Sequence, residues 1–178
     1  MREHYGNDDA EALCNALLTT EPEVSVRLNR CKIQLNEALH PLLDLDKVDG
    51  VNAVEWCNDA FYLSERPPFT FDPLLHAGVY YVQEASSMYV AKLMKDYGSE
   101  NACCALDLCA APGGKTTDLA ASLREAYGDG FILVSNEVMK ARAGVLAANV
   151  ALWGDPNVVV TSDDPNAFPA LPGYFDII

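Results

Sequence analysis

The stretch that decides the fold is ALDLCAAPGGKTTDLAASL, from Ala105 to Leu123. An apolar run ends on an acidic residue, small residues with Pro and two Gly follow, and Lys-Thr-Thr leads into a helical pattern. A glycine-bearing turn between a strand and a helix receives anionic or hydrogen-bonding ligands, because the free N–H groups of the first helical turn point into it. This stretch therefore predicts a ligand site.

The second half of the chain alternates between strand and helix patterns. Strands are expected at 102–108, 130–135 and 157–161, and helices at 115–127 and 138–153. Such alternation specifies a parallel sheet with right-handed crossovers, so residues 71–178 are predicted to be α/β with a Rossmann-like sheet. The strand that begins at YFDII is unclosed at Ile178. We expect it beside the first strand, in a piece of a longer protein.

The front of the chain predicts a small α+β module at residues 1–70. Helical apolar spacing covers 8–18, VSVRL alternates like a half-buried strand, and VNAVEWCNDAFYL indicates two strands joined at Asn58-Asp59. The Pro-rich stretch ERPPFTFDP predicts a linker. An amphipathic helix is then expected from Tyr80 to Gly98.

Composition predicts a folded, acidic protein with reduced thiols. Half of the 178 residues are hydrophobic and the net charge is −14, whereas a nucleic-acid binder normally presents a basic face. The six cysteines show no C-x-x-C spacing, which argues against a zinc site or a disulfide framework. Nothing resembles a signal peptide or a membrane span, so we expect a soluble, cytoplasmic protein without a metal site.

One local basic stretch softens the conflict between the acidic charge and RNA binding. VSVRLNRCK holds Arg27, Arg30 and Lys32 with no acid among them. It is the candidate RNA contact of the front module, and the alternative is an ordinary charged strand edge.

Three kinds of ligand compete for the glycine turn. A nucleoside triphosphate loop would need Gly where Cys109 stands, and the dinucleotide pattern G-x-G-x-x-G is absent because Gly113 and Gly114 are adjacent. One of these glycines is expected to adopt backbone angles closed to other residues, or to let a ligand approach the main chain.

Acids after the next two strands favour the third ligand, which is adenosine-bearing and lacks phosphates. Glu137 ends the second strand, where doubly wound folds place an acid that accepts both ribose hydroxyls. Asp163 and Asp164 follow the third strand, where a carboxylate can accept an adenine amino group. S-adenosylmethionine fits this set, because its cationic sulfonium also suits Asp107 at the end of the first strand.

The motifs also resemble a known family. DLCAAPGGKTTDLA, NE, DDP and FDII, with Arg142, Leu146 and Asn149 on one helical face, resemble the Sun-type (Nol–Nop–Sun) RNA 5-methylcytosine methyltransferases. Upstream, VSVRLN and RPPFTFDPLLHAGVYYVQEASSM resemble the bacterial ribosomal-RNA members. The resemblance covers nearly the whole chain, and CAAPGGKT is far more specific than a lone glycine motif.

The resemblance implies a cytosine carbon-5 methyltransferase that acts on structured RNA, with ribosomal RNA expected, and uses S-adenosyl-L-methionine. Asp164 is chosen over Asp163 because the family's adenine-side acid precedes a Pro or Gly. Arg142 and Asn149 are expected to pack or orient rather than to bind cofactor. The implied cofactor contacts are Cys109, Ala110, Ala111, Pro112, Gly113, Gly114, Lys115, Glu137 and Asp164.

No residue of this chain is expected to be catalytic, because the family's two cysteines belong to motifs that follow FDII. By itself the chain is expected to be inactive. Cys103 and Cys104 are expected on the buried first strand, and Cys109 is expected to contribute its backbone. A family signature also covers Gln83, Glu84, Ser86 and Ser87, which equally suit a helix-capping cluster and stay open.

Three functions remain open from the sequence. The first is the N-terminal part of an RNA cytosine methyltransferase, and the second is a non-catalytic cofactor-binding or RNA-docking protein that ends at Ile178. The third is a methyltransferase of protein or small molecules, against which the VSVRLN module argues. A monomer without membrane contact is expected, and neither the RNA nor the cytosine follows from the sequence.

Overall fold

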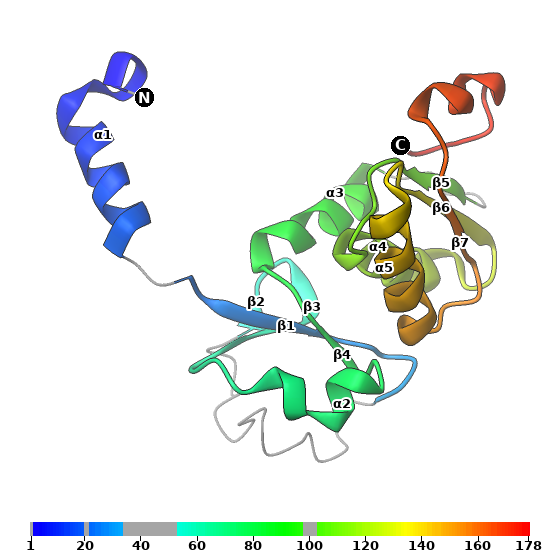
Figure 1. The fold of residues 1–178 in the computed structure, drawn as a ribbon, viewed down its shortest axis with the longest axis horizontal. Coiled ribbons are helices and arrows are strands. Elements are labelled where there is room, and N and C mark those ends of the chain that lie inside the picture. Colours follow the sequence, from blue (N-terminus) through cyan, green and yellow to red (C-terminus); the bar gives the residue numbers. More distant parts are fainter. Residues whose placement is uncertain (1, 20–21, 34–52, 98–102) are drawn as a thin grey trace.

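The structure is a computed structural model that describes residues 2–19, 22–33, 53–97 and 103–178. It contains an antiparallel sheet of order β2-β3-β1-β4 and a parallel sheet of order β5-β6-β7, with helices between the two sheets (Figure 1). The strands are β1 (Val24–Leu28), β2 (Ala53–Val54), β3 (Cys57–Leu63), β4 (Tyr80–Val82), β5 (Cys103–Asp107), β6 (Phe131–Asn136) and β7 (Val158–Thr161). The α-helices are α1 (Arg2–Thr19), α2 (Pro73–His76), α3 (Tyr89–Tyr97), α4 (Gly114–Tyr127) and α5 (Lys140–Trp153).

The central strand of the antiparallel sheet is β1, which pairs with both β3 and β4. Val26 and Leu28 point to one face, where they pack with Phe61 and Tyr80 beneath α2 and the 3-10 helix η2 (Phe69–Phe71). The alternation of VSVRL predicted a half-buried strand, and this is wrong. Ser25, Arg27 and Asn29 on the opposite face are buried as well, because helices of the second half of the chain cover them.

Two boundaries of the front module differ from those predicted. Val54 pairs with Cys57, so the turn lies at 55–56 rather than at Asn58-Asp59. The helix expected from Tyr80 begins only at Tyr89, because Tyr80–Val82 pairs with β1 instead and the 3-10 helix η3 (Ala85–Met88) follows. Pairing with the edge of β1 therefore outweighs the helical spacing of this stretch. The predicted helix end at Gly98 lies outside the described residues.

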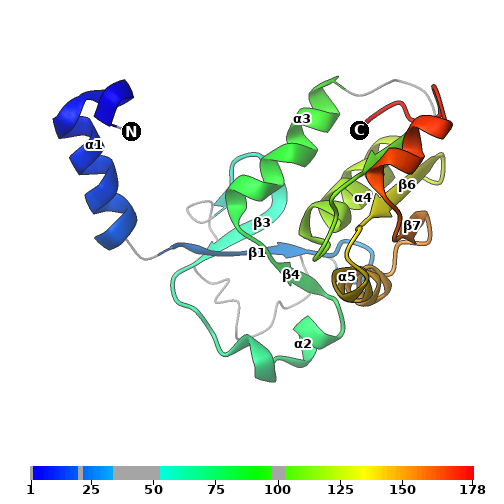
Figure 2. The ribbon, with the colours of Figure 1, turned by 45° about the horizontal axis from the view of Figure 1, so that its top comes forward.

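The Pro-rich stretch ERPPFTFDP connects β3 to β4, two strands of one sheet. The antiparallel sheet therefore extends beyond residue 70 to Val82. Helix α1 stands apart from the rest of the ribbon in both views (Figures 1 and 2). None of the described helices is long and apolar enough to cross a membrane.

The parallel sheet confirms the predicted alternation, and each element bound lies within about two residues of its expected place. Helices α3 and α4 cover it through a core that includes Met94, Leu123 and Leu133. Ala105 of β5 also bridges to Ile177 in parallel. The expectation that the fourth strand lies beside the first is therefore confirmed, and β5 has neighbours on both sides.

Two adjacent residues of α5 provide a matched test of a second core cluster, in which α5 packs against the glycine turn and β7. Leu146 is 0% exposed and packs with Ala110 and Val150, whereas Val145 is 50% exposed. Leu146→Ala should lower the free energy of unfolding by about 2–5 kcal/mol, because it leaves a cavity, and Val145→Ala should change it by under ~1 kcal/mol. Urea denaturation measures both, and equal losses would contradict this packing.

Candidate functional site

The glycine turn lies between β5 and α4, at the carboxyl end of β5. Gly113 has φ +113° and precedes the first helical residue, Gly114. Ala110 is buried and its amide donates to the Asn136 carbonyl at 2.8 Å, while Cys109 and Lys115 are exposed. The turn is therefore fixed at its base and open on its outer side, and the expectation of unusual glycine angles is confirmed at Gly113.

Two side chains of helix α5 hold the turn by donating hydrogen bonds to the carbonyl groups of the turn. Arg142 Nη2 donates to the Ala111 carbonyl at 2.9 Å, and Asn149 Nδ2 donates to the Pro112 carbonyl at 2.7 Å. Arg142 and Asn149 thus contact the turn, and the expectation that they pack or orient rather than bind cofactor stays a prediction. Both side chains therefore fix the turn through its carbonyl oxygens.

Asn136 joins the ends of the three strands, a role that the sequence reasoning missed. Its side chain is 0% exposed. Its Oδ1 accepts from the Thr161 hydroxyl and the Asp163 amide, both at 2.9 Å, and its Nδ2 donates to the carbonyls of Asp163 at 3.0 Å and Leu108 at 3.4 Å. The only sequence signal was a buried-strand position occupied by an amide. This residue fixes the edge where the predicted ligand residues meet.

Asp107 ends β5 and faces the start of α4. Its Oδ2 accepts from the Thr116 hydroxyl at 2.7 Å. Burial raises the pKa of Asp107, and the Thr116 hydroxyl, the Cys109 amide and the charge of Lys115 all act against that rise. The carboxylate is therefore held in place by donors and remains suited to a cationic group.

The two other acids occupy the ends of the neighbouring strands. Glu137 is buried, its Oε1 accepts from the Met139 amide at 3.0 Å, and its Oε2 lies 3.4 Å from Arg142 Nη1. Asp164 is exposed and its Oδ1 accepts from the amide and the side chain of Asn166, both at 2.8 Å. The structure thus brings the turn, Glu137 and Asp164 to one edge of the parallel sheet.

The structure shows the role of part of the Gln83 to Ser87 segment. Glu84 caps η3, because its carboxylate accepts from the Ser86 amide at 3.3 Å and the Ser87 hydroxyl at 3.4 Å. The hydrogen bond from the Ser86 hydroxyl lowers the pKa of Glu84. The capping interpretation is confirmed for these residues, whereas Gln83 lies buried beside the glycine turn.

The candidate RNA contact is wrong for Arg27, which is 1% exposed. Arg30 pairs with Asp59, and Lys32 Nζ donates to the Leu152 carbonyl at the end of α5 at 2.6 Å. The basic residues of this stretch therefore engage other parts of the chain.

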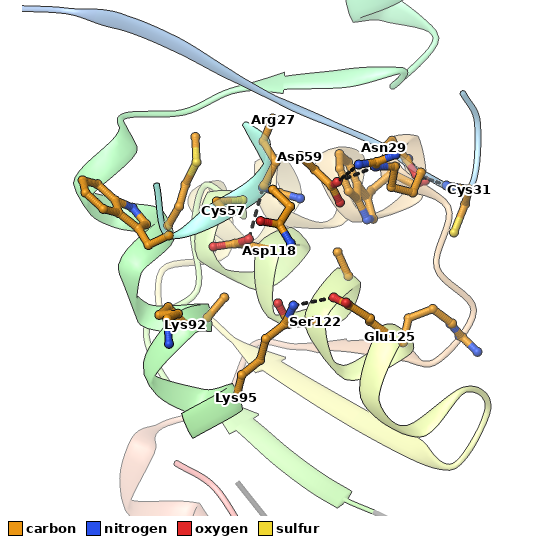
Figure 3. A pocket seen from close by; sticks show the side chains of 18 of the residues that line it. Arg27, Asn29, Cys31, Cys57, Asp59, Lys92, Lys95, Asp118, Ser122 and Glu125 are labelled. Atoms are coloured by element: carbon orange, nitrogen blue, oxygen red, sulfur yellow. Dashed lines mark hydrogen bonds and ion pairs between the residues drawn. The ribbon is translucent and has the colours of Figure 1, made fainter. Parts of the chain in front are cut away.

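A cavity of about 850 Å³ is bounded by β1, the β2–β3 turn, α3 and α4, and Figure 3 shows side chains that line it. As far as the described residues go, its lining includes none of the predicted cofactor contacts. Ion pairs line it instead: Arg27 with Asp118, and Lys95 with Glu125. Over the same described part of the chain, no cluster of His, Cys, Asp and Glu could hold a metal ion.

Two family descriptions match this chain. "N-terminal domain of 16S rRNA methyltransferase RsmF" matches residues 1–85, and "16S rRNA methyltransferase RsmB/F" matches residues 96–178. The chain belongs to the RsmB/F family. The resemblance to the bacterial ribosomal-RNA branch of the Sun-type enzymes is thereby confirmed.

Curated relatives agree with the RsmB/F assignment. Ribosomal RNA small subunit methyltransferase F of Aliivibrio salmonicida is 34% identical over 184 residues, which cover 100% of this chain and 36% of that protein. The protein of the same name from Klebsiella pneumoniae is 35% identical over 187 residues, with 100% and 36% covered. The chain therefore spans about a third of the length of these relatives.

Solved structures support the RsmB/F fold. A methyltransferase homolog protein from Pyrococcus horikoshii is 26% identical, with a TM-score of 0.75, over 99% of this chain and 55% of that one. NSun6 from the same organism, solved with SFG, has a TM-score of 0.73 at 15% identity, over 96% of this chain and 65% of that one. The second likeness is one of fold alone.

The two glycines of the turn should respond oppositely to alanine. Gly113→Ala should lower the free energy of unfolding by roughly 1–3 kcal/mol, because φ is +113° and the new Cβ would lie 3.3 Å from Leu146 Cδ1. Gly114→Ala should be neutral or stabilising by about 0.4–1 kcal/mol, because the nearest atom, Tyr81 Cε1, would lie at 3.5 Å. Thermal unfolding of both variants measures this, and a greater loss for Gly114→Ala would contradict the geometry.

Proposed function

We propose that this chain is the cofactor-binding part of a ribosomal RNA cytosine carbon-5 methyltransferase that uses S-adenosyl-L-methionine. The observation that carries the proposal is that the glycine turn, Glu137 and Asp164 lie together at the carboxyl edge of the parallel sheet, in a chain of the RsmB/F family. A ribosomal substrate would be met in the cytoplasm.

In this proposal the turn receives the amino-acid end of the cofactor. The first N–H groups of α4 can donate to its carboxylate, because they have no partner within the helix. Asp107 favours the cationic groups, since its carboxylate stands at the end of β5 and is oriented by Thr116. The turn residues involved are Cys109, Ala110, Ala111, Pro112, Gly113, Gly114 and Lys115.

Glu137 and Asp164 are proposed to bind the adenosine. An ionised carboxylate has about four lone-pair sites, so Glu137 can accept ribose hydroxyls while it still accepts from the Met139 amide. Both contacts of Asp164 to Asn166 use Oδ1, so Oδ2 can accept the adenine amino group. The bound cofactor supplies the reactive methyl group, and the residues of this chain bind and orient it.

A tritium-transfer assay tests the activity. We expect the full-length protein to transfer a labelled methyl group to ribosomal RNA from a strain that lacks the enzyme, with the label recovered as 5-methylcytosine after nuclease digestion. Heat-treated protein provides the background. Label that resists ribonuclease and stays with protein would favour a protein substrate instead, and label on another nucleoside would contradict the proposed carbon-5 chemistry.

Glu137→Ala should weaken the binding of S-adenosylhomocysteine, as measured by calorimetry. Each lost charge-assisted hydrogen bond contributes about 1.5–3 kcal/mol, so Kd should rise on the order of tenfold to a hundredfold. Glu125→Ala is the control, because Glu125 lies on α4 and pairs with Lys95, away from the turn. An unchanged Kd in Glu137→Ala would remove this residue from the site.

A matched pair completes this binding test at the adenine side. Asp164→Asn should raise Kd for S-adenosylhomocysteine about tenfold, because an amide is a poorer acceptor than a carboxylate. Asp163→Asn should change Kd less, because Asp163 meets Asn136 through its main chain. The reverse order would assign adenine recognition to Asp163.

A further inference from the structure

One arginine of the antiparallel sheet reaches the helix that follows the glycine turn. Arg27 Nη2 donates to the Thr117 hydroxyl at 2.6 Å and approaches the Gly114 carbonyl at 3.5 Å, and Nη1 approaches the Thr117 carbonyl at 3.4 Å. Its Nε donates to Gln83 Oε1 at 3.1 Å and lies 3.3 Å from Asp118 Oδ1. The guanidinium therefore contacts the first turn of α4 directly, and Figure 3 shows its ion pair with Asp118 of the same helix.

The environment of Arg27 is one in which an arginine is costly. Burial lowers the pKa of Arg27, and Asp118 opposes this effect. The guanidinium carbon also lies 4.4 Å from the centre of the Trp153 ring, which adds a cation–π contact. A buried guanidinium needs acceptors in fixed positions, so the atoms around Arg27 are held in one arrangement.

The contacts of Arg27 with Thr117 and Gly114 connect to the glycine turn through the backbone. The Thr117 amide donates to the Gly113 carbonyl at 2.9 Å, and Gly114 is the first residue of α4. Arg27 thus holds the first turn of α4, and Gly113, with its positive φ, is the residue that immediately precedes this helix. The guanidinium presents its donors from three nitrogens in a rigid fork, whereas a lysine ammonium presents them from a single atom and cannot reproduce the same spread of contacts.

We propose that Arg27 is a positioning residue that sets the glycine turn for cofactor binding, so that cofactor affinity depends on the antiparallel sheet. This inference rests on the proposed function, because it assumes that the turn receives S-adenosylmethionine. Arg27 acts through Thr117 and Gly114 and does not itself contact the cofactor.

Asn29 is a matched control for Arg27. It lies two residues after Arg27, directly beyond the end of β1, is 1% exposed like Arg27, and also joins the front module to the crossover helices. Its Nδ2 donates to the carbonyls of Gly78 at 3.0 Å and Trp153 at 2.8 Å. These contacts meet the end of α5 rather than the start of α4, so Asn29 supports the interface without touching the turn.

The test measures Kd for S-adenosylhomocysteine in the full-length protein, at a temperature where each variant is folded by circular dichroism. Arg27→Lys should raise Kd about tenfold or more. Asn29→Ala should lower the unfolding temperature while Kd changes by less than about twofold. Thr117→Val, which keeps the side-chain size and removes the hydroxyl that Arg27 reaches, should raise Kd several-fold and serves where Arg27→Lys does not fold.

Coupling to the turn provides a readout that general stabilisation would not move. If Arg27 acts through the turn, Arg27→Lys in a Gly113→Ala background should raise Kd much less than it does alone, because contacting residues are non-additive. Full additivity, an unchanged Kd in folded Arg27→Lys or Thr117→Val, or an equal rise in Asn29→Ala would overturn the inference. Absence of binding by the unchanged protein would instead overturn the proposed function.

Discussion

The burial of the Arg27 guanidinium between the two sheets is the interaction on which the arrangement of the chain depends. The guanidinium contacts the start of α4 through Thr117 and the end of α5 through the ring of Trp153. Burial raises the pKa of Asp118 to about 6, and the charge of Arg27 opposes this effect. Because a buried charge without partners is costly, the antiparallel sheet and both crossover helices are constrained to one relative placement.

Close backbone approach reinforces this placement on the α5 side. Gly78 has φ +68°, and a Cβ at this position would lie 2.2 Å from the Leu152 carbonyl oxygen. Lys32 donates to the same carbonyl, and Asn29 donates to that of Trp153. The last carbonyls of α5 are thus satisfied by side chains of the front module.

At the edge of the parallel sheet, some side chains hold the backbone in place and others are exposed to solvent. Asn136 is buried and joins three strand ends, while Arg142 and Asn149 hold the carbonyls of the turn. Polar side chains that are fully satisfied within the protein cannot also serve a ligand without exchange of partners. Cys109, Pro112, Lys115 and Asp164 are exposed at this edge, which suits a site whose frame is built before the ligand arrives.

The sequence by itself determined the parallel sheet, its crossover helices and the glycine turn, because these features depend on local periodicity and on backbone angles that few residues adopt. It also placed Glu137 and Asp164 at strand ends, since parallel strands bring their carboxyl ends to one edge. Only the tertiary structure decided that Arg27 is buried, that Tyr80 begins a strand and that Asn136 joins the ends of three strands. These outcomes depend on partners far away in the chain, and the local pattern of a polar residue is the same whether solvent or another helix covers it.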